Sequence, residues 1–71
     1  MPIQTWDEAV AYLTPERGRE IVTASDGADE LAGRVVRAYA RATVEFNSGT
    51  LAALLAALNA YQLGIDNIVQ S

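Results

Sequence analysis

Three arginines are the side chains whose type and spacing best suit a specific contact. Arg34, Arg37 and Arg41 follow one another at intervals of three and four residues, so a helix would carry all three on one face. The planar guanidinium group makes bidentate hydrogen bonds with carboxylates and stacks on aromatic rings. The common explanation for such a row is a solvated helix face that pairs with Glu30 and Glu45. The alternative is a contact surface, in which the three arginines bind an acidic partner.

Trp6 and Tyr12 are two further candidates for contact with a partner. Both lie in a short predicted helix near the start of the sequence, which offers too little surface to bury two large rings. Aromatic residues at apolar helix positions usually pack in a core, and this is the expectation for Tyr39, Phe46 and Tyr61. Trp6 and Tyr12 are therefore the aromatic residues that we expect to reach a partner.

The residues that catalysis and metal binding usually require are missing. The sequence has no His and no Cys, so it lacks the commonest general base, a thiolate nucleophile and the usual ligands of zinc. The adjacent carboxylates Asp7-Glu8 and Asp29-Glu30 fall in first helical turns, where the helix dipole accounts for them. The isolated glycines and the absence of Lys exclude a phosphate-binding loop. We predict a protein that is not an enzyme and that uses no cofactor or metal.

The charge balance argues against nucleic acid and anionic membranes as partners. Nine acidic and five basic residues give a net charge of −4, whereas those surfaces favour clustered cations. Residues 1–8 lack the basic and apolar regions of a signal peptide, and the longest apolar run, 51–60, is shorter than the roughly 20 residues that cross a bilayer. We expect a soluble, cytoplasmic protein that does not bind membranes.

Capping residues and hydrophobic spacing predict two short helices in the first part of the chain. Thr5-Trp6-Asp7-Glu8 matches a capping box and begins a helix of about two turns. Thr14-Pro15 ends this helix and begins the next, which runs to about Thr23 and has the weakest pattern. Ser25-Asp26-Gly27 predicts a turn, in which Ser25 or Asp26 caps the helix that follows.

Two longer helices are predicted in the remainder. The third runs from Ala28 to about Phe46, with an apolar face that includes Phe46. Residues 47–50 form the break, where Gly49 suits a left-handed backbone and Ser48 or Thr50 acts as a cap. The fourth runs from Leu51 to about Leu63 and is expected to stop at Gly64.

The fourth predicted helix is apolar on every side, which predicts that it is buried on several sides. One stripe is rich in leucine, and the opposite side carries alanines where a surface helix would carry charges. A chain of 71 residues has few elements to cover it, and without disulfides or metal a second subunit is the remaining source of stability. We therefore expect a homodimer through residues of this helix: Leu51, Ala52, Leu55, Ala56, Leu58 and Tyr61.

These observations predict an all-α protein, a compact bundle of three to four short helices in which the third and fourth form an antiparallel hairpin. Residues 1–71 make one protein-interaction domain. The first hypothesis for its function is a regulator that occupies a surface of an unidentified protein. The absence of Lys and the abundance of Ala suggest GC-rich coding, so this regulator would be a phage or mobile-element inhibitor of a bacterial protein, acting in the host cytoplasm.

Two other hypotheses remain open. A structural or assembly subunit would self-associate through the fourth helix and form larger oligomers. A DNA-binding regulator would use the arginine row on a recognition helix, but the net charge, the absence of Lys and the lack of a helix-turn-helix pattern make it the weakest of the three.

Overall fold

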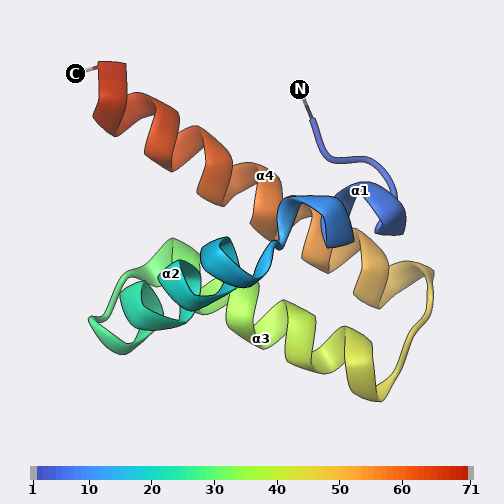
Figure 1. The fold of residues 1–71 in the computed structure, drawn as a ribbon. Helices are drawn as coiled ribbons and strands as arrows, with labels where there is room; N and C mark the ends of the chain where they lie inside the picture. The colour runs from blue at the N-terminus through green and yellow to red at the C-terminus, as the bar shows by residue number, and fades with distance from the viewer. Residues whose placement is uncertain (1, 71) are drawn as a thin grey trace.

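The computed structural model describes the chain from residue 2 to residue 70, and the side chains from residue 2 to residue 65. In these residues the chain forms four helices and no strand. They are α1 (Trp6–Tyr12), α2 (Pro15–Asp26), α3 (Glu30–Val44) and α4 (Ser48–Gln70). Helices α3 and α4 lie side by side and run in opposite directions, α2 packs on α3, and α1 lies across α4 (Figure 1). The predicted all-α bundle with its antiparallel hairpin is confirmed.

The starts of α1 and α2 are those that the capping residues predict. The Thr5 hydroxyl accepts a hydrogen bond from the backbone N–H of Glu8 at 3.1 Å, and the Thr14 hydroxyl accepts one from Arg17 at 3.2 Å. Pro15 occupies the first turn of α2, where its missing N–H leaves no hydrogen bond unmade. Local chemistry therefore sets both boundaries.

The turn between α2 and α3 lies further along the chain than the sequence predicts. Ser25 and Asp26 belong to the last turn of α2, and neither caps α3. The cap is Asp29, whose carboxylate accepts a hydrogen bond from the N–H of Ala32 at 3.1 Å. The chain reverses at Ala28, which has a φ of 71°. The left-handed conformation therefore falls on an alanine, one residue after Gly27.

The break between α3 and α4 is also set by a residue that the sequence pattern did not single out. Helix α3 ends at Val44, before Phe46. The Asn47 side chain accepts from the N–H of Thr50 at 2.9 Å, and the Thr50 hydroxyl accepts from the N–H of Asn47 at 2.9 Å. This reciprocal pair starts α4 at Ser48, so Asn47 is the cap. Gly49 lies inside α4 and, like the other described glycines, has no positive φ.

Helix α4 does not stop at Gly64, and this prediction is wrong. The helix continues through Gly64 to Gln70. The reason for the glycine lies in packing: a Cβ atom at this position would lie 2.7 Å from Cδ1 of Leu31. Gly64 is therefore a point at which the α4 backbone comes close to the Leu31 side chain of α3.

The length of α4 bears on the expected location of the protein. Among the described residues, Ser48–Ile65 is a helix long and apolar enough to cross a membrane. The sequence pattern does not predict a helix of this length, because it predicts that the fourth helix stops at Gly64. A mostly buried core helix of a soluble protein can be equally long and apolar. Of Ser48–Ile65, 17% is buried, and Leu54, Leu58 and Tyr61 are its residues in the core together with Ala57. The cytoplasmic location stays a prediction.

The core forms where one face of α3 meets one face of α4, with α1, α2 and the segment before α1 closing its sides. Its largest fully buried side chains are Ile21, Val35, Leu54 and Leu58. Phe46, expected on the apolar face of α3, lies beyond the end of that helix and is 58% exposed. The buried set is small and comes from every part of the chain: Ile3, Ala9, Ile21, Ala32, Val35, Ala42, Leu54, Ala57, Leu58 and Tyr61.

Candidate protein-binding groove

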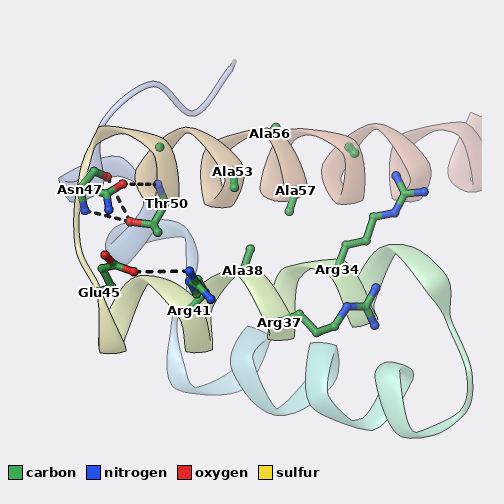
Figure 2. A pocket seen from close by; sticks show the side chains of 12 residues that line it. Arg34, Arg37, Ala38, Arg41, Glu45, Asn47, Thr50, Ala53, Ala56 and Ala57 are labelled. Atoms are coloured by element: carbon green, nitrogen blue, oxygen red, sulfur yellow. Dashed lines mark hydrogen bonds and ion pairs between the residues drawn. The ribbon is translucent and has the colours of Figure 1, made fainter.

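The arginine row and the alanines of α4 line one open groove between α3 and α4. From α3 come Arg34, Arg37 and Arg41, and from α4 come alanines on the side that faces them. The groove has a volume of about 740 Å³. Figure 2 shows Ala53 and Ala57 pointing from α4 toward α3. We call this site the arginine–alanine groove. Its α4 wall is formed by Gly49, Thr50, Ala53, Ala56, Ala57 and Ala60.

Two of the three arginines pair with the glutamates that the sequence suggested. Arg34 lies 2.9 Å from Glu30, and Arg41 lies 3.4 Å from Glu45. All four side chains are more than half exposed. Exposed pairs of this spacing contribute only about 0.3–0.5 kcal/mol. A partner carboxylate can therefore replace either glutamate at little cost.

Arg37 differs from its neighbours. Among the described side chains it has no ion pair. Its guanidinium group folds back along α3, where Nη1 lies 3.3 Å from the position that a Cβ of Gly33 would occupy (Figure 2). The absence of a side chain at Gly33 makes this position accessible. Arg37 is thus the cation of the row that is free to meet a carboxylate from another molecule.

The α4 wall of the groove has short side chains, because most of its residues are alanines. Alanine has the highest helix propensity, so the sequence keeps α4 helical without long side chains on this side. Ala53 and Ala56 are exposed, whereas Ala57 is 8% exposed and joins the core. Small side chains let two helix axes approach to about 8 Å. The groove can therefore admit a helix, with the arginines along one of its sides.

The residues predicted for self-association do not lie on one surface. Leu58 and Tyr61 are 0% and 5% exposed, so both pack inside the single chain. Leu51 and Leu55 are half-buried, and Ala52 and Ala56 are exposed. Any self-association through α4 would therefore exclude Leu58 and Tyr61. It would use the remaining predicted residues: Leu51, Leu55, Ala52 and Ala56.

Trp6 and Tyr12, the predicted aromatic contacts, are both half-buried. The Trp6 ring stacks on Tyr39 with 6.4 Å between ring centres, and Phe46 packs edge-on against it at 5.3 Å. The Arg17 guanidinium lies 4.2 Å from the centre of the Tyr12 ring, and it donates a hydrogen bond to the Tyr12 carbonyl at 2.6 Å. Tyr12 is therefore held within the chain.

The more exposed rings are two that the sequence placed in the core. Tyr39 is 43% exposed and Phe46 is 58% exposed. For Phe46 the missed signal is its place directly before Asn47, the residue that caps α4. A residue in a connection between two helices has fewer neighbours to bury it than one within a helix.

The described residues contain no cluster of acidic side chains suited to a metal ion. Burial raises the pKa of Tyr61 above its ordinary value, and the nearby carboxylates of Glu20 and Asp29 raise this pKa further. Tyr61 lies in the core and lines neither wall of the arginine–alanine groove. The groove is thus a surface of fixed charges and small apolar side chains, which suits binding.

No protein-family model, curated protein or solved structure matches this chain.

Proposed function

We propose that this protein is a small, non-enzymatic regulator that binds an acidic helical segment of a partner protein in the arginine–alanine groove. The observation that carries the proposal is the placement of three of the five basic residues along one wall of this groove. The chain as a whole carries a net charge of −4. The groove is therefore a local cationic site on an acidic protein, and it complements carboxylates.

The spacing of the arginines supports a helix as the bound segment. Arg34 and Arg41 are two helical turns apart, about 10 Å along α3. A helix lying along the groove presents carboxylates at the same interval when Asp or Glu occurs at positions i, i+3 or i+4, and i+7. The other side of the bound helix contacts the alanines of α4. The bound helix therefore needs small or apolar residues beside its acidic row.

Exchange of ion pairs gives such a partner its specificity. Glu30 and Glu45 screen the ends of the arginine row, while Arg37 in the middle has no ion pair among the described side chains. A partner with one carboxylate would meet Arg37 first, and one with three would also displace both glutamates. Binding of a larger bacterial protein in this way would block whatever else that acidic helix contacts, which is the action of an inhibitor.

The test is a titration with a defined peptide probe. The probe is an alanine-based helical peptide with Glu at i, i+4 and i+7, and its control carries Gln at the same positions. We expect the Glu peptide to bind the wild type, Arg37→Glu to weaken binding by about tenfold or more, and the Gln peptide not to bind.

Arg19→Glu is the matched control variant, because it makes the same charge change on an exposed residue of α2 outside the groove. It should bind the Glu peptide almost as the wild type does. Equal weakening by both variants would mean that net charge alone attracts the peptide, and the proposed groove would then have no role.

Self-association as a structural subunit is the second candidate. It is favoured by the exposed side of α4, where Ala52 and Ala56 are exposed and Leu63 is 63% exposed. Ala52→Glu distinguishes the two candidates, because Ala52 is exposed and lies outside the arginine–alanine groove. If larger oligomers form and this variant dissociates them, α4 is an assembly surface.

A further inference from the structure

The Arg37 side chain lies differently from that of Arg34, its neighbour in the row. Figure 2 shows the Arg34 side chain reaching toward α4, whereas the Arg37 side chain points away from α4. The Nη1 atom of Arg37 and the hydroxyl oxygen of Ser25 both lie within 4 Å of the point that a Cβ of Gly33 would occupy. The Arg37 guanidinium therefore rests over Gly33 and beside the last turn of α2, rather than across the arginine–alanine groove.

The electrostatics of this resting place favour a cation. Ser25 lies in the last turn of α2, and the dipole of a helix presents partial negative charge at that end. The last turn of α2 has no basic residue of its own. Arg37 brings a positive charge from α3 to this end of α2, which is a physical reason for the guanidinium to rest there when no partner is bound.

The position of Arg37 explains why residue 33 is a glycine. Gly33 lies within α3 and is buried, although glycine is disfavoured inside a helix. A Cβ at this position would lie 3.7 Å from the Ser25 hydroxyl oxygen, which is an ordinary van der Waals contact. It would lie only 3.3 Å from Nη1 of Arg37, which is closer than such atoms normally approach. The neighbouring helix can thus accept a methyl group at residue 33, and the Arg37 guanidinium is the group that would have to move.

Gly33 also keeps Arg37 without an acidic neighbour on its own helix. The other two arginines of the row each pair with a glutamate four residues away. At that spacing Arg37 has Gly33 on one side and Arg41 on the other, and neither can pair with a cation. Among the described side chains, Arg37 therefore has no ion pair to break when it leaves its resting place over Gly33.

We infer that Gly33 is a positioning residue of the arginine–alanine groove: it gives Arg37 a resting place, from which the guanidinium moves to a carboxylate when an acidic helix binds. The inference rests on the proposed function, because it concerns the regulation of the same site. The resting place competes with the partner for Arg37. The apparent affinity of the groove is therefore lowered to the fraction of molecules in which Arg37 is already turned toward it.

The first measurement is the affinity of Gly33→Ala for the Glu peptide. The added methyl group displaces the guanidinium from its resting place, so this variant should bind about threefold more tightly or better. In an Arg37→Gln background the same change should leave the affinity unaltered. Gly18→Ala is the matched control, because it makes the same substitution in α2, outside the groove, and it should bind as the wild type does. Circular dichroism verifies the helix content of each variant.

The second measurement separates this inference from the proposed function. In the free wild type, nuclear Overhauser contacts should join the side-chain protons of Arg37 to Gly33 and Ser25, and they should disappear when the Glu peptide saturates the protein. If these contacts are absent in the free protein or persist in the complex, or if Gly33→Ala binds no more tightly than the wild type, the inference is overturned and the proposed function stands. No binding of the Glu peptide to the wild type would overturn both.

Discussion

The Asn59 side chain binds both backbone polar groups of Ile3. Its Oδ1 accepts a hydrogen bond from the Ile3 N–H at 2.8 Å, and its Nδ2 donates to the Ile3 carbonyl at 2.9 Å. The same Nδ2 donates to the carbonyl of Leu55 at 2.9 Å. Asn59 is the one polar residue within the apolar run 51–60. It fastens the segment before α1 to α4 and holds Ile3 in the core, where it is 6% exposed.

Replacing Asn59 should therefore destabilise the whole bundle. Asn59→Ala leaves the polar groups of Ile3 without partners in a half-buried place, and we expect a loss of about 1–3 kcal/mol in the free energy of unfolding. Asn59→Asp should be worse, because it sets a carboxylate against two carbonyl oxygens. Urea denaturation measures both. A change within about 0.5 kcal/mol for Asn59→Ala would show that these bonds do not hold the segment.

Replacing Ala28 with glycine should increase the stability of the protein. Its φ of 71° is a left-handed conformation that costs a residue with a Cβ about 1 kcal/mol or more, and glycine adopts it freely. Ala28→Gly should raise the free energy of unfolding by about 1 kcal/mol. Gly27→Ala is the control, because Gly27 has a φ of −85° and needs no such freedom. If Ala28→Gly lowers stability, the chain does not reverse at Ala28.

Gly18 and Gly64 should respond differently to alanine, although both lie within helices. Apart from its chain neighbours and the surrounding helix backbone, no atom lies within 4 Å of a Cβ at Gly18, so Gly18→Ala should stabilise by about 1 kcal/mol through helix propensity. Gly64→Ala should gain less, because its Cβ meets Leu31. In a Leu31→Ala background this contact is absent, and Gly64→Ala should then recover the gain. Thermal unfolding of the four variants checks this, and additive effects would argue against the close approach.

The stability should fall at alkaline pH, through Tyr61. Burial raises the pKa of this phenol in the folded state above its unfolded value of about 10. The neutral form is therefore favoured in the folded protein, and its contribution is fully present below pH of about 10 and lost as the pH rises through the folded pKa. Tyr61→Phe should flatten the pH dependence in this window. An unchanged dependence would mean that another group causes it.

Local signals in the sequence were sufficient for the starts of α1 and α2, because Thr5 and Thr14 make hydrogen bonds within their own first turns. They were not sufficient at Gly64. A glycine near the end of an apolar helix is typical of a stop, and only its contact with Leu31, far along the chain, shows that it is a packing site. The turn at Ala28 was missed for a related reason, since the left-handed residue is one that propensity disfavours.

The two walls of the candidate groove were each visible in the sequence, as an arginine row and as alanine rows. The sequence did not show that these two walls face each other, because this depends on how α3 and α4 are rotated about their axes within the hairpin. The same rotation puts Leu58 and Tyr61 in the core and Ala53 beside the arginines. Spacing along one helix gives a face, but the facing element is set by packing.

The most direct test of the arginine–alanine groove compares two peptides of opposite charge on the wild type and on Arg37→Glu. The affinity of wild type and of Arg37→Glu is measured by calorimetry for two helical peptides, one with Glu and one with Lys at i, i+4 and i+7. We predict that the wild type binds the Glu peptide and not the Lys peptide, and that Arg37→Glu reduces this preference by about tenfold or more. An unchanged preference in Arg37→Glu, or no binding of the Glu peptide to the wild type, would contradict the proposed function.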